Sequence, residues 1–207
     1  MVILGLTGSI GMGKSTAARS FVRLGAALYD ADLAVHALLA PGGRAVAPVL
    51  AAFPSVRRDA PEGVTIDRKA LGAIVFNDKA ALRRLEAILH PLVRRDERAF
   101  IARARRARRR LVVLDIPLLF EARETGQVDA SVVVSAPKRI QRARVLSRSG
   151  MSAAKLDAIL GHQLSDGAKR RRADFVVPTG LGRRESLRAV RAIARRVVPK
   201  RRTAESE

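Results

Sequence analysis

The sequence predicts an α/β protein built on a parallel β-sheet, and three observations carry this prediction. Short apolar runs of strand length lie at residues 2–7, 111–115 and 130–135, and stretches with helical periodicity separate them. A glycine-rich loop joins the first run to the first expected helix. The chain has 207 residues, of which 48% are apolar, so it is long enough to bury a sizeable core.

The first 32 residues predict a strand–loop–helix–strand unit. Residues 2–7 form a continuous apolar run, which is typical of a strand buried on both faces. Residues 14–24 place apolar side chains on one side of a helix, and a glycine follows them. Residues 26–29 form a second apolar run that ends at Asp30 and Asp32. A unit of this kind indicates a parallel sheet.

The middle of the chain, residues 33–110, contains almost no β-branched run and predicts a helical insertion. Its expected helices cover residues 44–53, 67–76, 78–89 and 91–110. A polar loop is expected at 54–66, and a helix break before Pro91. We interpret the arginine-rich stretch 103–110 as the solvated end of a long helix, with a nucleic-acid patch as the alternative.

Strands are expected again in the last half of the chain. They cover residues 111–115, 130–135 and 174–177. A helical stretch, broken at Gly150, is expected over residues 137–172. A final amphipathic helix is expected over residues 183–198.

Residues 8–15 match the pattern G-x-x-x-x-G-K-[ST] at every fixed position and lie between a strand and a helix. In such a loop, successive backbone N–H groups cradle phosphates, and the helix N-terminus adds positive potential. We expect Lys14 to reach the β- and γ-phosphates of a nucleotide and Ser15 to hold Mg²⁺. The residues expected to bind the nucleotide are Gly8, Ser9, Ile10, Gly11, Met12, Gly13, Lys14, Ser15 and Thr16. The alternative is a glycine-rich turn that carries a surface lysine.

Three acidic residues follow or close expected strands, where ligands bind in open α/β sheets. Of Asp30 and Asp32, we expect one to cap the following helix and Asp32 to be catalytic, accepting or orienting the proton of an acceptor hydroxyl. Asp115 closes the run 111–115, and we expect it to hold the water shell of Mg²⁺ rather than to act as a cap.

Composition excludes some classes of function. The chain has no cysteine, which rules out disulfides, Cys-ligated zinc, iron–sulfur clusters and thiol catalysis. It has no apolar run long enough to span a membrane and no signal peptide at its start, so we expect a cytoplasmic protein. The net charge is +21, and 33 of the 40 basic residues are Arg. We interpret the excess as mainly a bias of composition on solvated faces, with nucleic-acid binding as the alternative.

The order of motifs resembles the dephospho-coenzyme A kinase family. The loop at 8–15 is followed by Asp30-Ala31-Asp32, by His90-Pro91 and by the segment 115–121, Asp-Ile-Pro-Leu-Leu-Phe-Glu. The resemblance covers residues 2–180 and implies ATP-dependent phosphorylation of the ribose 3′-hydroxyl of dephospho-coenzyme A. That reaction is the last step of coenzyme A synthesis. The implied fold is a P-loop kinase with a five-stranded parallel sheet flanked by helices.

The resemblance also implies a division of the chain. A nucleotide-binding core would comprise residues 1–32, 109–137 and 171–207. Residues 33–108 would be an inserted helical domain that binds the substrate, and residues 138–170 a helical lid.

Four further residues are candidates for a functional or structural role. The resemblance makes His90 a substrate contact, with a structural role as the alternative. It makes Arg144 and Arg148, which are spaced i, i+4, a catalytic clamp on the transferring phosphate. We expect Glu121 to be structural, paired with an arginine of the insertion.

Competing functions are another nucleoside, nucleotide or metabolite kinase, and a nucleic-acid-stimulated NTPase. We expect ATP and Mg²⁺ as cofactors, dephospho-coenzyme A as the substrate, no membrane partner and a monomer.

Overall fold

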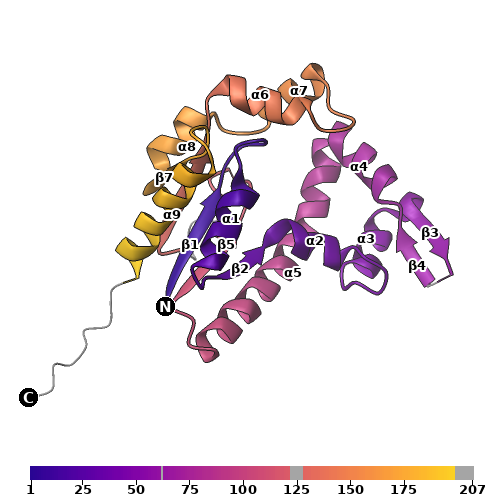
Figure 1. Cartoon of the computed structure of the whole chain (residues 1–207). Helices are drawn as coiled ribbons and strands as arrows, with labels where there is room; N and C mark the ends of the chain where they lie inside the picture. The colour runs from indigo at the N-terminus through magenta and orange to yellow at the C-terminus, as the bar shows by residue number, and fades with distance from the viewer. Residues whose placement is uncertain (62, 122–127, 199–207) are drawn as a thin grey trace, which may run out of the picture. The chain divides into compact units, whose positions relative to one another are not determined.

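The structure, a computed structural model, describes residues 1–61, 63–121 and 128–198 (Figure 1). The chain divides into two compact units. The larger comprises Met1–Tyr29 and Arg103–Glu207, and the smaller comprises Asp30–Ala102. Each unit has its own hydrophobic core.

A parallel five-stranded sheet in the order β2-β5-β1-β6-β7 organises the larger unit. Its strands are β1 (Val2–Thr7), β2 (Ala27–Asp30), β5 (Leu111–Asp115), β6 (Ala130–Ser135) and β7 (Phe175–Pro178). The predicted parallel sheet is therefore confirmed, and the bounds of β1, β5 and β6 are those that their apolar runs predict. The register pairs Leu6 of β1 with Asp115 of β5, which brings this acid beside the end of the central strand.

Alternation along the strands gives the sheet two apolar faces. Leu4 and Leu6 lie on the face covered by α1 (Lys14–Arg23) and α9 (Arg183–Val197), which pack against each other (Figure 1). Phe21 of α1 is fully buried there, and burying such a side chain contributes about 1.5–3 kcal/mol. The packing of α1 against α9 and the sheet thus fixes the start of α1 relative to the end of β1.

Three helices separate β6 from β7. They are α6 (Lys138–Leu146), α7 (Ala153–Gly161) and α8 (Asp166–Arg172). The predicted break near Gly150 is confirmed. A second break, at 162–165, is not predicted, and it arises because Ser165 accepts a hydrogen bond from the N–H of Ala168 and starts α8 (3.2 Å).

The smaller unit is helical apart from one hairpin. Its elements are α2 (Ala31–Leu38), α3 (Val46–Ala52), a 3₁₀ turn (Pro54–Val56), β3 (Arg57–Ala60), β4 (Gly63–Ile66), α4 (Arg68–Asn77) and most of α5 (Lys79–Arg106). The prediction of a polar loop at 54–66 is wrong, because β3 and β4 pair as antiparallel strands. The residues of β3 are mostly exposed, so this strand has no apolar pattern that the sequence would reveal, and backbone hydrogen bonds pair it with β4.

The long helix α5 is continuous over 28 residues and contains Pro91. The predicted break before Pro91 is therefore wrong. Proline removes one backbone donor, but Leu85 and Leu89 in the preceding turns are buried in the core of the smaller unit. Packing on that face holds the helix together across the lost hydrogen bond.

The end of α5 carries Arg103, Arg105 and Arg106 in its last turn, as the interpretation of a cationic helix end expects. The chain leaves the helix through Arg108, whose φ of 52° is left-handed. No helix in the part of the chain that the structure describes is long and apolar enough to cross a membrane.

The junction between β6 and β7 is expected to be sensitive to acid. Two hydrogen bonds of 2.7 Å, from the Ser131 hydroxyl and the Ser131 backbone N–H, hold the pKa of the Asp174 carboxyl below its usual value. A lowered folded-state pKa stabilises the fold above the unfolded-state value of about 4. This contribution is lost as the pH falls through the folded-state value.

We therefore expect Asp174→Asn to lower the melting temperature at pH 7 and to lower it less at pH 3. Thermal melts across this range measure the difference. The control is Asp59→Asn, which changes an exposed acid of β3 that pairs with Arg57. An equal deficit of Asp174→Asn at both pH values would contradict the linkage.

Candidate active site

The loop between β1 and α1 has a backbone that only glycine adopts readily at two positions. Gly11 has a φ of 76° and Gly13 a φ of 88°, both left-handed. A Cβ atom at Gly11 would also lie 2.5 Å from Cγ2 of Val145, so no larger residue fits there. Helix α1 begins at Lys14 without a side-chain cap at its N-terminus. A helix start of this kind is suited to an anion.

Side chains from outside the loop hold its backbone in place. Gln141 donates to the carbonyl of Ile10 (2.8 Å), and Gln163 accepts from the N–H of the same residue (3.4 Å). The hydroxyl of Thr179 donates to the carbonyl of Met12 (2.6 Å). The loop is therefore held by three separate segments, which lie in α6, before α8 and after β7.

Lys14 forms an ion pair with Asp115, and the two side chains come from α1 and the end of β5. Asp115 is nearly fully buried and Lys14 is largely buried, so water screens this pair weakly. Ser15 lies exposed in the first turn of α1. The structure thus brings together Lys14 and Asp115, two of the predicted site residues, and Ser15 follows Lys14 in the chain.

No group of three or more His, Asp or Glu side chains that could hold a metal ion occurs among the described residues. Mg²⁺ is commonly bound in proteins by one or two oxygen ligands together with substrate phosphates and waters. The Ser15 hydroxyl and the Asp115 carboxylate are oxygen donors of the type that Mg²⁺ prefers. The residues present therefore fit a magnesium ion that is held mainly by a nucleotide.

The two predicted clamp arginines differ in their surroundings. Arg144 donates to the carbonyl of Thr179 (2.7 Å) and to the carbonyl of Gly11 (3.5 Å). Arg148 is exposed and lies beyond the end of α6 at Leu146. The expectation that both lie on one helical face is wrong, because α6 ends at Leu146, two residues before Arg148.

A pocket of about 840 Å³ adjoins the loop. Its walls include Ser9 and Met12 of the loop, Pro137 at the start of α6, Gln163 before α8 and Gly180 after β7. The pocket therefore lies among the segments that follow the carboxyl ends of β1, β6 and β7, where ligands bind in sheets of this kind.

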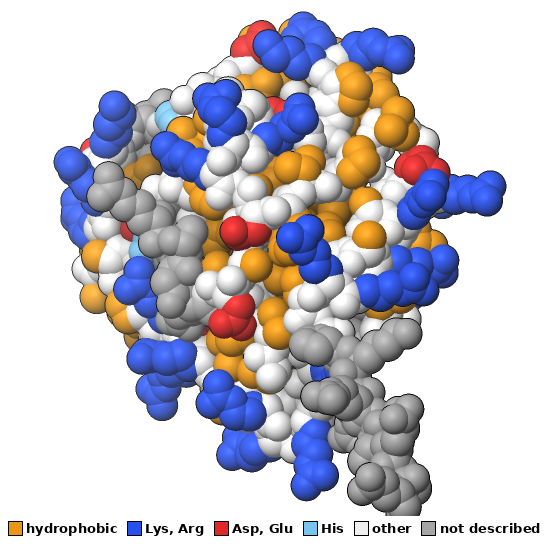
Figure 2. Space-filling model, turned by 90° about the vertical axis from the view of Figure 1, so that its left-hand side faces the viewer, with side chains coloured by type: hydrophobic (Ala, Val, Ile, Leu, Met, Phe, Trp, Pro, Cys, Tyr) orange, Lys and Arg blue, Asp and Glu red, His pale blue; other side chains and the backbone are white. Residues whose placement is uncertain are grey.

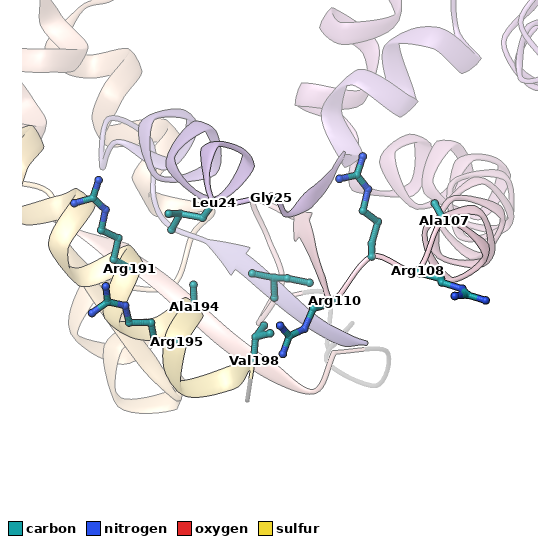
Figure 3. Close-up of a pocket in the computed structure, with 11 residues that line it drawn as sticks. Leu24, Gly25, Ala107, Arg108, Arg110, Arg191, Ala194, Arg195 and Val198 are labelled. Atoms are coloured by element: carbon teal, nitrogen blue, oxygen red, sulfur yellow. The ribbon is translucent and has the colours of Figure 1, made fainter. Parts of the chain in front are cut away.

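A second pocket, of about 630 Å³, lies near the amino ends of the strands (Figure 3). Its arginines come from α9 and from the connection between α5 and β5: Arg191, Arg195, Arg108, Arg109 and Arg110. Figure 2 shows Lys and Arg side chains spread over one face of the molecule with few acids among them. A dispersed distribution on that face agrees with the interpretation of a compositional bias.

The smaller unit holds the other predicted site residues. The carboxylate of Asp30 accepts a hydrogen bond from the N–H of Leu33 (3.0 Å) and caps α2. The prediction that one of the two acids is a cap is confirmed. Asp32 lies exposed in the first turn of α2, and His90 is half-buried inside α5.

Sequence reasoning missed Thr179 and Lys169. Thr179 is buried and binds both Met12 and Arg144, and its only sequence signal is a hydroxyl directly after the last strand. Lys169 is fully buried in α8 and forms an ion pair with Glu121 (2.9 Å). The prediction that Glu121 pairs with an arginine of the insertion is therefore wrong.

Comparisons with known proteins agree with this geometry. A profile of the dephospho-CoA kinase family matches residues 2–181. A dephospho-CoA kinase of Paramagnetospirillum magneticum is 63% identical over 170 residues, which are 82% of this chain and 78% of the relative. One of Rhodospirillum rubrum is 58% identical over 92% of this chain and 89% of the relative.

Solved structures share the fold. A protein of Thermus thermophilus is similar with a TM-score of 0.81 and 32% identity, over 96% of this chain and 98% of that one. A dephospho-CoA kinase of Campylobacter jejuni is similar in fold, with a TM-score of 0.63 and 24% identity, over 95% of this chain and 97% of that one. By its motifs, its fold and these relatives, the chain belongs to the dephospho-CoA kinase family.

Proposed function

We propose that this protein transfers the γ-phosphoryl group of ATP to the ribose 3′-hydroxyl of dephospho-coenzyme A, giving coenzyme A and ADP. The observation that carries the proposal is the family match over residues 2–181, on a chain whose Gly8–Ser15 loop has the left-handed glycines and outside supports of a phosphate cradle. Location in the cytoplasm and a monomeric state stay predictions from the sequence.

The nucleotide would bind with its phosphates on the loop and its base in the pocket of about 840 Å³ beside it. Pockets of this size suit a nucleotide-sized ligand. Lys14 would neutralise the β- and γ-phosphates, and α1 would add the positive potential of its N-terminus. Mg²⁺ would be held by Ser15 and, through water, by Asp115, and it would neutralise charge that develops on the phosphates.

The acceptor hydroxyl must lose a proton as it takes the phosphoryl group. Asp32 is the candidate base, because Asp30 already caps α2 and Asp32 keeps an exposed carboxylate. The same carboxylate and His90 are proposed to contact the dephospho-coenzyme A. Arg144 and Arg148 are proposed to neutralise the transferring phosphate from α6 and the turn after it.

Helices α6–α8 are proposed to form the lid and the smaller unit to bind the acceptor. The compact smaller unit, Asp30–Ala102, overlaps the predicted insertion at 33–108. A closing lid would exclude water from the transferring phosphoryl group and so prevent its transfer to water.

The direct test is an assay with ATP, Mg²⁺ and a panel of acceptors. We expect phosphorylation of dephospho-coenzyme A and none of a nucleoside, a nucleoside monophosphate or a hydroxylated carboxylic acid. Preference for another acceptor would favour the competing metabolite-kinase hypothesis. Stimulation of ATP hydrolysis by DNA or RNA would instead favour the NTPase hypothesis.

Lys14→Ala is expected to abolish phosphoryl transfer while the protein stays folded. Lys14 supplies the charge that the phosphates need in the transition state, and no other lysine lies in the loop. Activity is measured in the assay above, and circular dichroism checks the fold. Near-normal turnover by the folded variant would refute the role of the loop.

Asp32→Asn changes almost only the charge of the side chain, so it tests the proposed base. We expect kcat to fall by about 10²–10⁴, the usual contribution of general-base assistance, with little change in melting temperature. The matched variant Asp30→Ala removes the cap of α2 and should cost about 1 kcal/mol of stability with a small effect on kcat. A large loss of kcat in the Asp30 variant, with little loss in Asp32→Asn, would assign the catalytic role to Asp30.

Arg144→Ala and Arg148→Ala should differ from each other. Arg144 also supports the backbone at Gly11 and Thr179, so its loss should raise the KM for ATP as well as lower kcat. Arg148 makes no such contact among the described residues, so its loss should lower kcat with little change in that KM. Steady-state kinetics measures both parameters. Unchanged kcat in both variants would show that neither arginine acts on the transferring phosphate.

A further inference from the structure

Lys169 is a lysine with no exposed surface, in a chain whose cations lie mostly on the outside. Lysine is rarely buried completely, because removing its charge from water is costly unless the ammonium finds partners. Here the ammonium pairs with Oε1 of Glu121 at 2.9 Å and donates to the carbonyl of Pro117 at 3.3 Å. These contacts join α8 to the segment that follows β5.

The Glu121 carboxylate also binds a third segment. Its Oε1 accepts a hydrogen bond of 2.8 Å from the N–H of Leu164, in the turn between α7 and α8. Its Oε2 is buried and makes no hydrogen bond among the described residues. A buried ion pair by itself is weak evidence for a role in stability, so the position of this pair calls for another explanation.

Both partners of Glu121 lie next to groups that hold the nucleotide loop. Gln163 precedes Leu164 and accepts from the N–H of Ile10 within the loop (3.4 Å). Pro117, which receives the ammonium of Lys169, also accepts a hydrogen bond from the hydroxyl of Thr7 (2.8 Å). Thr7 is the last residue of β1, directly before the loop. The ion pair is therefore connected to Thr7, directly before the loop, through Pro117. It is connected to Ile10, within the loop, through Leu164 and Gln163.

We propose that Lys169 and Glu121 are positioning residues for the nucleotide loop, and this inference rests on the proposed function. The ion pair sets the base of helices α6–α8 against the segment after β5. Gln163 and Thr7 then reach the loop in the arrangement that cradles phosphates. Loss of the pair lets the turn at 162–165 move away and releases Ile10, and a misplacement of about 1 Å at a reacting group can cost about 100-fold in rate.

The pair acts on one substrate only. Its contacts among the described residues lie in the larger unit, which also contains the loop and the neighbouring pocket. The proposed acceptor residues, Asp32 and His90, belong to the smaller unit. Loss of the pair therefore changes the KM for ATP and the kcat, and leaves the KM for dephospho-coenzyme A unchanged. A purely structural role would reduce the amount of folded enzyme and leave both KM values as they are.

The decisive variant is the double substitution Lys169→Met with Glu121→Gln, which removes both charges and keeps the volumes close. Replacing both members of a buried pair is often nearly neutral for stability, so this variant is expected to fold. We expect its KM for ATP to rise about tenfold or more, and its kcat to fall. Hydrogen exchange should become faster in peptides that contain Ile10 and Leu164.

Two comparisons separate position from stability. The single variant Lys169→Met leaves the Glu121 charge buried without its partner, so it should show the same kinetic change together with a lower melting temperature. The control is Arg57→Met with Asp59→Asn, which removes an ion pair of β3 whose side chains are 55% and 77% exposed. It should change neither the KM for ATP nor the exchange at Ile10.

Unchanged ATP kinetics in the folded double variant would overturn the inference, as would an equal rise in both KM values. Affinity for a non-hydrolysable ATP analogue and hydrogen exchange at Ile10 need no acceptor. They test the position of the loop even where wild-type enzyme does not phosphorylate dephospho-coenzyme A. A wild-type enzyme that does not phosphorylate dephospho-coenzyme A would refute the proposed function but not the positioning role of the ion pair.

Discussion

A phosphate cradle depends on backbone N–H groups that keep pointing toward one place, and glycine backbones do not hold such an arrangement by themselves. Gly11 and Gly13 allow the left-handed turns, and the same freedom would let the loop relax when it is not supported. Gln141, Arg144 and Thr179 bind the loop carbonyls and restrict that freedom. The site therefore depends on a flexible loop made rigid by side chains from elsewhere.

The parallel sheet explains why those side chains come from distant parts of the chain. In a parallel sheet, the segments after neighbouring strands all start at the same edge. Asp115 ends β5, Gln141 lies in the helix after β6, and Thr179 follows β7. The order β5-β1-β6-β7 brings these three segments around the loop that follows β1. Chain connectivity and sheet order together build the site.

The basic side chains of this protein fall into two groups, a large one on the surface and a small one in the interior. Most of the 40 basic residues are arginines on solvated surface, where each charge costs little. Two lysines depart from this pattern: Lys14 pairs with a buried acid, and Lys169 pairs with Glu121 without any exposure. Lys14 belongs to the nucleotide loop, and Lys169 is connected to it through Pro117 and Thr7. These two lysines therefore bring charge into the interior of the larger unit near the loop.

Patterns within one short segment could be predicted from the sequence. The runs 2–7, 111–115 and 130–135 are mostly apolar, and burial on both faces of a sheet favours such runs. The spacing of glycine, lysine and serine at 8–15 defines the loop and the start of α1. The capping role of Asp30 or Asp32 also follows from local sequence, since a cap bonds only to residues two or three positions away.

Contacts between distant segments decided the rest. Strand β3 has mostly exposed residues and no apolar alternation, so its pairing with β4 is not revealed by a pattern in its own sequence. Helix α5 continues through Pro91 because its apolar face is packed in the core of the smaller unit. The partner of Glu121 is Lys169, 48 residues further along the chain by their numbering. Sequence periodicity reports which face of a segment is buried, but the partner it is buried against exists only once the chain has folded.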